Sequence, residues 1–244
     1  MCRKLSMWSR CFKVLGLVVD TSVGACSVGL YEHGSSGLTC LYDDTALMTR
    51  GHQEYIGPQI WNCFQKSGIK PSSLNFVGVT LGPGSFTGLR VGLSFAKGLA
   101  EGAGVPLSGF STLEAMAALG GLEDVRRLVV IEAGRGQVYL QAFEGMAAVG
   151  GPISLTIKDN EALNAYAAAL PDVAVLTGSG CEHVRSYWPK AEVIPQISPS
   201  ILAMAHLMFD DCDRSDVRPI YIREPDAKVS DKRIVRFDTE PPAA

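Results

Sequence analysis

The sequence predicts an α/β protein of two lobes, each with a mixed sheet that begins in an antiparallel hairpin and is flanked by helices. Near the N-terminus, three strand-like runs are separated only by short polar turns, which indicates an antiparallel meander. Helix-like and strand-like runs then alternate, as they do in α/β folds. A second pair of strand-like runs begins near residue 128. This second hairpin repeats the pattern of the first and indicates two related halves of the chain.

The first lobe is expected over residues 14–110. A helix is expected over about residues 52–66, beginning near Pro58 or bending there, with Gly68 as its C-terminal cap. A second helix, over about residues 88–103, follows a glycine-rich loop. The expected strands are rich in β-branched and aromatic residues and comprise VLGLVVD (14–20), CSVGLYE (26–32), LTCLYDDT (38–45) and FVGVTLG (76–82).

The second lobe is expected over residues 111–224. Its strands are expected in LVVIEA (128–133) and QVYLQAFE (137–144), and its helices in EALNAYAAAL (161–170) and PSILAMAHLMF (199–209). Two terminal segments are expected to be poorly ordered: a basic N-terminal extension of residues 1–13 and a C-terminal tail of residues 225–244.

Composition excludes several classes of protein. The chain has 244 residues, of which 47% are hydrophobic, so it can bury a large core. Its 22 basic and 25 acidic residues give a net charge of −3, which does not favour direct nucleic-acid binding. Seven scattered cysteines without a C-x-x-C pair indicate reduced thiols. The apolar run at residues 14–19 is too short for a signal peptide or a membrane span, so a cytoplasmic protein is expected.

The stretch LGPGSFTGLRVG, residues 81–92, matches no named phosphate-binding or catalytic motif. It lacks the lysine of a Walker A loop, the third glycine of a dinucleotide fingerprint and the glycines of a nucleophile elbow. Two interpretations remain. Either Ser85 or Thr87 caps the following helix, or these hydroxyls and the backbone around Gly84 hold an anion at the helix start.

Small residues recur along one side of the helix that follows this loop. Gly88, Gly92, Ala96 and Ala100 are spaced every four residues. Because glycine inside a helix costs about 1 kcal/mol relative to alanine, this pattern indicates a close contact. The expected partner is another helix, either residues 52–66 of the same chain or a helix of a second protein.

Six segments carry a resemblance to a known family. They are GLVVDTSVGACSVGLYE (16–32), RGHQEYIGPQI (50–60), GPGSFTGLRVGLSFAKGLA (82–100), VPLSGFSTLEAMA (105–117), EAGRGQVYLQAFE (132–144) and PIYIREPDAK (219–228). In this order they resemble the TsaB, or YeaZ, family, which bacteria require for threonylcarbamoyladenosine on tRNA. The resemblance implies the actin-like, ribonuclease-H-like ATPase superfold and paralogy with TsaD, the catalytic protein. Two departures, Glu132-Ala133-Gly134-Arg135 for Asp-Ala-Arg and Gln53 for serine or threonine, weaken any specific role for the second hairpin.

The resemblance implies a non-catalytic subunit that binds and supports TsaD. TsaD would form N6-threonylcarbamoyladenosine next to the anticodon of tRNAs that read codons beginning with A, with TsaE as a further partner. This chain would form a homodimer when TsaD is absent, meet tRNA only through the complex and contact no membrane. ATP and metal would be bound by partner subunits, and no cofactor by this chain. The implied interface comprises His52, Tyr55, Ile56, Gly88, Arg90, Gly92, Ala96, Lys97 and Ala100.

Two rival functions remain open. A glycoprotease-like metallopeptidase would need a bound metal, but the metal-binding histidine positions of TsaD fall on Thr112 and Met116 here. The four histidines of the chain also contain no pair four residues apart. A weak nucleotide-binding member of the superfold would use the first hairpin and the glycine-rich loop, and its candidate residues are Asp20, Thr21, Ser22, Gly84, Ser85 and Thr87.

Overall fold

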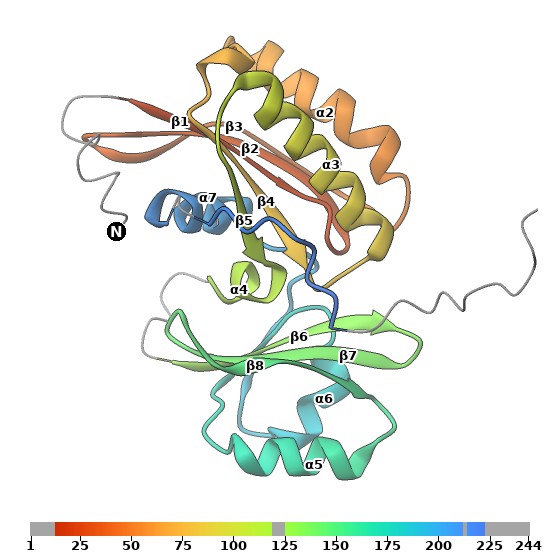
Figure 1. Cartoon of the computed structure of the whole chain (residues 1–244). Helices are drawn as coiled ribbons and strands as arrows, with labels where there is room; N and C mark the ends of the chain where they lie inside the picture. Colours follow the sequence, from red (N-terminus) through yellow and green to blue (C-terminus); the bar gives the residue numbers. More distant parts are fainter. Residues whose placement is uncertain (1–12, 119–124, 212–213, 223–244) are drawn as a thin grey trace, which may run out of the picture.

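The computed structural model describes residues 13–118, 125–211 and 214–222 of the chain. Two five-stranded sheets form two lobes, one above the other, and helix α4 (Thr112–Ala117) lies between them (Figure 1). The predicted α/β class and the hairpin at the start of each sheet are confirmed. Residues 1–12 of the predicted extension and the whole predicted tail, residues 225–244, lie outside the described residues.

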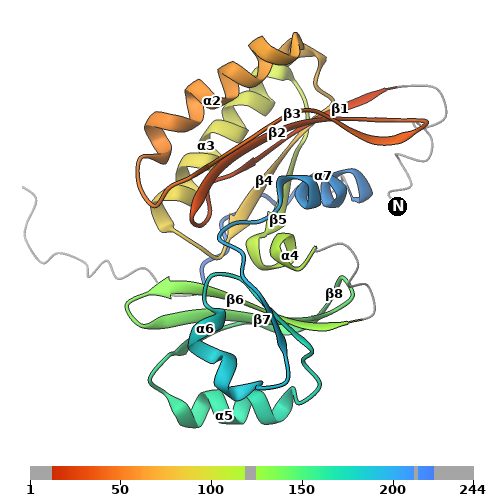
Figure 2. The same ribbon diagram turned by 180° about the vertical axis from the view of Figure 1, so that it is seen from behind.

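The first sheet has the strand order β3-β2-β1-β4-β5, with the first three strands antiparallel and the last two parallel to β1. Helices α2 (His52–Ser67) and α3 (Phe86–Ala103) cover one face of this sheet, and α7 (Ile201–Asp210) covers the other (Figure 2). The strands are β1 (Val14–Asp20), β2 (Ala25–Gly34), β3 (Gly37–Leu47), β4 (Phe76–Gly82) and β5 (Leu107–Ser111), with a 3-10 turn at η1 (Pro71–Ser73).

Alternation along β1 explains how both faces of this sheet are buried. Leu17 and Val19 pack in the cluster under α2 and α3, whereas Val18 packs with α7 on the opposite face. All three side chains are fully buried. The sequence placed the helix of residues 199–209 in the second lobe, and this assignment is wrong. Its apolar residues complete the otherwise uncovered face of the first sheet instead.

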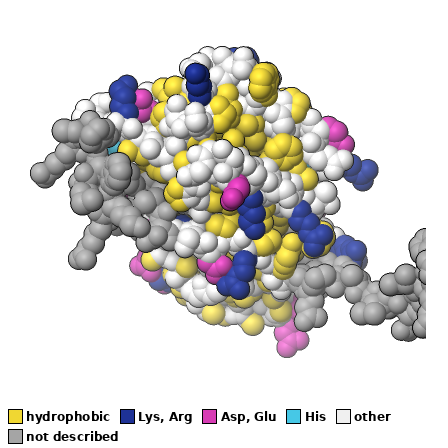
Figure 3. Space-filling view, turned by 45° about the horizontal axis from the view of Figure 1, so that its top comes forward, with side chains coloured by type: hydrophobic (Ala, Val, Ile, Leu, Met, Phe, Trp, Pro, Cys, Tyr) yellow, Lys and Arg dark blue, Asp and Glu magenta, His cyan; other side chains and the backbone are white. Residues whose placement is uncertain are grey.

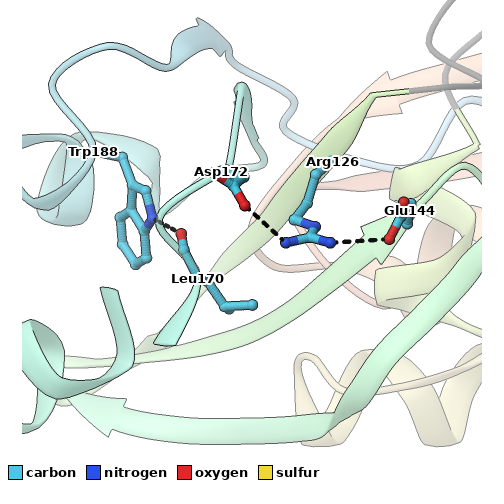
Figure 4. A network of polar contacts seen from close by, with 5 residues as sticks. All are labelled: Arg126, Glu144, Leu170, Asp172 and Trp188. Carbon is cyan, nitrogen blue, oxygen red and sulfur yellow. Dashed lines mark hydrogen bonds and ion pairs between the residues drawn. The ribbon is translucent and has the colours of Figure 1, made fainter. Parts of the chain in front are cut away.

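The second sheet has the order β10-β9-β6-β7-β8. Helices α5 (Asn160–Ala169) and α6 (Cys181–Val184) pack on one face, and α4 packs on the other. At the start of the central strand of this sheet, Arg126 pairs with Glu144 at 3.0 Å and with Asp172 at 3.6 Å, and nearby Trp188 Nε1 donates to the Leu170 carbonyl oxygen at 2.9 Å (Figure 4). The strands are β6 (Arg126–Gly134), β7 (Gln137–Glu144), β8 (Ala147–Thr156), β9 (Val175–Thr177) and β10 (Glu192–Ile194), with a 3-10 turn at η2 (Arg185–Tyr187).

Helices α2 and α3 have the predicted signals at their ends. Helix α2 ends at Gly68, which adopts a left-handed conformation with φ of 70°. It starts at His52, so Pro58 lies inside the helix rather than at its beginning. Helix α3 starts after Ser85, whose Oγ accepts a hydrogen bond from the Gly88 backbone N–H at 3.2 Å. The capping interpretation of Ser85 is therefore confirmed.

Gly88 and Gly92, the first two small residues of α3, contact a turn rather than another helix. An added Cβ at Gly88 would lie 2.1 Å from the Thr21 carbonyl oxygen, and one at Gly92 would lie 2.3 Å from Thr21 Oγ1. Ala96 and Ala100 are buried in the core cluster between the helices and the sheet. The predicted helix partner is therefore wrong for Gly88 and Gly92, because the hairpin turn at Thr21 fills the space, whereas Ala96 and Ala100 share their cluster with the buried residues of α2.

Replacing Gly92 with alanine should destabilise the fold. The added methyl group displaces the Thr21 side chain, and overpacking of this kind typically costs about 1–3 kcal/mol. Gly98 is the matched control, because it is exposed on the same helix and an added Cβ there has no neighbour within 4 Å. Gly98→Ala should gain up to about 1 kcal/mol from helix propensity. Urea denaturation should show a lower free energy of unfolding for Gly92→Ala and a higher one for Gly98→Ala. Stabilisation by both substitutions would contradict the contact between Gly92 and Thr21.

Ser85→Ala should lower the free energy of unfolding by about 0.5–2 kcal/mol, because the Gly88 N–H loses its acceptor. Thr87 lies in the first turn of the same helix, is also exposed, and makes no capping bond. Thr87→Ala should therefore change the thermal midpoint much less than Ser85→Ala. Equal losses for the two variants would show that Ser85 is not the cap.

Candidate functional site

The turn between β1 and β2 packs directly on the glycine-rich loop. The Ser85 backbone N–H donates to the Ser22 carbonyl oxygen at 2.7 Å, and Thr21 Oγ1 donates to the Gly88 carbonyl oxygen at 2.7 Å. At Gly84, an added Cβ would lie 2.1 Å from the Ser22 carbonyl oxygen. A side chain at this position is therefore excluded by backbone, and the glycine allows two loops to touch.

Asp20, at the end of β1, stabilises the turn through hydrogen bonds. Its Oδ1 accepts hydrogen bonds from the Ser22 N–H at 3.0 Å, Ser22 Oγ at 2.6 Å and Thr80 Oγ1 at 2.6 Å. Burial raises the pKa of the Asp20 carboxyl above its usual value, while hydrogen bonds from Ser22 and Thr80 act in the opposite direction. The carboxyl group is fully buried. It therefore serves the packing of the turn and does not reach solvent.

A cleft of about 880 Å³ lies between the two lobes. Most of its lining is apolar, and its charged residues are Glu132 and Arg135 at the end of the β6–β7 hairpin. The cleft is lined by Val23, Gly24, Thr49, Pro83, Gly84, Ser85, Phe86, Glu132, Ala133, Gly134, Arg135, Tyr139, Ser179, Ile197, Ile220, Tyr221 and Ile222. One wall thus comes from residues 220–222, at the end of the described chain.

The predicted anion-binding residues are brought together but do not form an open site. Gly84 and Ser85 line the cleft, whereas Asp20, Thr21 and Ser22 are buried beneath it. Thr87 is exposed and lies outside the lining. Polar groups of the turn and the loop are hydrogen-bonded to one another, and the lining of the cleft contains one acidic and one basic residue. This arrangement is poorly suited to the several negative charges of a nucleotide phosphate chain.

The two positions that correspond to the metal-binding histidines of TsaD lie in the core. Thr112 and Met116 of α4 are fully buried, and Met116 packs against the second sheet. Within residues 13–118, 125–211 and 214–222, no group of three or more His, Cys, Asp or Glu side chains is arranged to hold a metal ion. In the same part of the chain, no helix is long and apolar enough to cross a membrane.

The outer face of α2 and α3 carries exposed aromatic side chains. Tyr55, Trp61 and Phe95 expose 42%, 65% and 39% of their surface. Gly57 of α2 faces the Phe95 ring, and Trp61 follows Gly57 by one helical turn, so Trp61 and Phe95 both lie toward the seam between the helices. Figure 3 shows hydrophobic side chains gathered on this part of the surface among scattered basic residues. We call Trp61 and Phe95 the aromatic face.

Burial divides the predicted interface residues into two groups. Tyr55, Arg90 and Lys97 are exposed and available to a partner. The others point into this chain, so their predicted direct contact with a partner is corrected; they are His52, Ile56, Gly88, Gly92, Ala96 and Ala100. Sequence reasoning did not select Trp61 or Phe95 for the interface. Their exposed positions on otherwise amphipathic helices were the available signal.

Comparison with known proteins agrees with the fold and with the sequence resemblance. TsaB from Escherichia coli is 35% identical over 130 residues, which cover 52% of this chain and 54% of that protein. The match therefore spans about half the length of this relative. An uncharacterised protein from Mycobacterium tuberculosis is 29% identical over 216 residues, covering 87% of this chain and 93% of that protein.

A solved structure supports the fold alone. YeaZ from Pseudomonas aeruginosa superposes with a TM-score of 0.69 at 23% identity, covering 85% of this chain and 99% of that structure. The two-lobed α/β fold predicted from the sequence is thereby confirmed. A family model described as "TsaD: tRNA N6-adenosine threonylcarbamoyltransferase" matches residues 46–170, just over half of the chain. The resemblance to TsaB is confirmed, and the chain belongs to this TsaD family of tRNA N6-adenosine threonylcarbamoyltransferases and related proteins.

Proposed function

We propose that this chain is a non-catalytic subunit that binds TsaD and supports its transfer of a threonylcarbamoyl group to tRNA. The product would be N6-threonylcarbamoyladenosine next to the anticodon of tRNAs that read codons beginning with A. TsaE would act as the ATPase partner, and ATP and metal would be bound by the partner subunits. The chain would work in the cytoplasm and meet tRNA only as part of the complex.

The aromatic face is the observation that carries this proposal. Isolated exposed apolar residues are ordinary on protein surfaces, but here two large aromatic side chains, Trp61 and Phe95, lie toward the seam between two neighbouring helices, and Tyr55 is exposed on the other flank of α2. Trp and Tyr are enriched among residues that dominate the energy of protein interfaces. Arg90 and Lys97 lie along the edge of α3 away from Phe95, so they would form a charged rim. We expect the same face to form the homodimer when TsaD is absent.

The chemistry of the remaining surface supports a non-catalytic role. A metallopeptidase needs an open metal with a bound water, but Thr112 and Met116 replace the expected histidines and are buried. A kinase-like use of the first hairpin needs an accessible carboxylate, and Asp20 is fully buried. The cleft between the lobes offers mostly apolar groups. Surface recognition therefore explains more of the molecule than catalysis does.

The direct test is reconstitution with TsaD and TsaE of the same organism. We expect the chain to co-purify with TsaD, and modification of tRNA to require both proteins. The chain alone should neither modify tRNA nor cleave glycoproteins, and elemental analysis should find no stoichiometric zinc or iron. A bound metal whose removal abolishes a peptidase activity of the purified chain would contradict the proposal.

Trp61→Ala should weaken TsaD binding by about tenfold or more, because a Trp at the centre of an interface typically contributes at least 1–2 kcal/mol. The Trp61 side chain is 65% exposed, so the fold should be retained. Leu202→Ala is the matched control, since Leu202 is an exposed apolar residue on α7, across the sheet from α2. Calorimetry should show normal TsaD affinity for this control. Wild-type affinity for Trp61→Ala would exclude the aromatic face as the interface centre.

A further inference from the structure

Three side chains form an exposed cluster where α3 begins. The Arg90 guanidinium carbon lies 3.7 Å from the centre of the Phe86 ring, and Arg90 Nε donates to the Tyr221 hydroxyl at 3.4 Å. The Phe86 and Tyr221 rings are 5.4 Å apart between their centres. Phe86 and Arg90 are one turn apart on α3, whereas Tyr221 lies 131 residues further along the chain. Tertiary structure therefore assembles this cluster.

Residues 214–222 bring Tyr221 to α3. The Ile220 backbone N–H donates to the Leu81 carbonyl oxygen at 2.7 Å, beside the start of the glycine-rich loop. At the other end of this segment, the Gly109 N–H donates to the Arg214 carbonyl oxygen at 3.1 Å. Arg214 also pairs with Glu114 of α4 at 2.7 Å. These bonds attach the segment at residues 214 and 220, on the N-terminal side of Tyr221.

The cluster holds a guanidinium group in place while leaving it exposed. Phe86 and Tyr221 expose 43% and 41% of their surface, and Arg90 is also exposed. Stacking on Phe86 and the bond from Nε fix the plane of the group. The two terminal nitrogens of Arg90 make no hydrogen bond or ion pair in the part of the chain that the structure describes. A planar pair of donors thus has no partner among the described residues and is free to meet a ligand there.

We infer that this cluster binds a carboxylate side chain of TsaD, an inference that rests on the function proposed above. A fixed guanidinium matches the two oxygens of a carboxylate through parallel hydrogen bonds. Because Arg90 is already held by Phe86 and Tyr221, less side-chain freedom is lost on binding. The cluster lies at the edge of α3 opposite Phe95, so it extends the partner surface from the aromatic face to the C-terminal segment.

Substitutions of Arg90 and Tyr221 distinguish recognition by a fixed guanidinium group from attraction by positive charge alone. Arg90→Lys keeps the positive charge but loses the planar donors and the stacked geometry, so TsaD affinity should fall about five- to tenfold. Tyr221→Phe, which removes only the hydroxyl acceptor, should weaken binding about two- to threefold. Arg185→Lys is the control, because Arg185 is an exposed arginine at η2 in the second lobe, away from α3, and the affinity of this variant should not change. Thermal midpoints should stay at the wild-type value for all three.

Carbodiimide coupling provides a second readout with the Arg90→Lys variant. The reagent activates the carboxylate of TsaD, the introduced Nζ amine displaces the urea, and an amide bond forms between the two proteins. We expect one cross-link at position 90 that the wild-type arginine does not give. If wild-type chain binds TsaD but Arg90→Lys keeps full affinity and forms no cross-link, the inference is overturned. If the wild-type chain itself does not bind TsaD, the proposed function fails instead.

Discussion

Contact between the β1–β2 turn and the glycine-rich loop determines how the first lobe is built. Thr21 and Ser22 bond to Gly88 and Ser85 through backbone and hydroxyl groups, and glycines at positions 84, 88 and 92 allow this approach. Asp20 holds the turn from inside the sheet. Helix α3 is therefore fixed at its N-terminal half against β1 and β2. Its outer side, and α2 beside it, are consequently presented to solvent as one surface.

The same contact limits what the cleft between the lobes can do. Groups that could have faced a phosphate are used between the turn and the loop, and the lining that remains is mostly apolar. Helix α4 packs on both sides, with Ala115 in the cluster under α7 and Met116 in the cluster of the second sheet. This continuous packing joins the lobes. An account based on an exposed recognition surface is therefore simpler than one based on nucleotide-driven closure of the cleft.

Local patterns in the sequence were sufficient for part of this structure. Strand runs, the two hairpins and the Ser85 cap depend on neighbouring residues, and they were predicted correctly. The place of α7 was not predicted, because an apolar helix does not specify which sheet it covers. Likewise, the spacing of Gly88 and Gly92 indicated a close contact but not that Thr21 makes it. Tyr221 could not be linked to Arg90, since their meeting depends on the path of residues 214–222.

The central claim is that this chain acts through the outer surface of α2 and α3. Hydrogen–deuterium exchange of the chain, measured alone and with TsaD, tests it most directly. The account predicts slower exchange in residues 52–67 and 86–103 on binding, with no change in the cleft-lining hairpin of residues 132–138. Protection of the cleft hairpin with unchanged exchange in both helices would contradict the account.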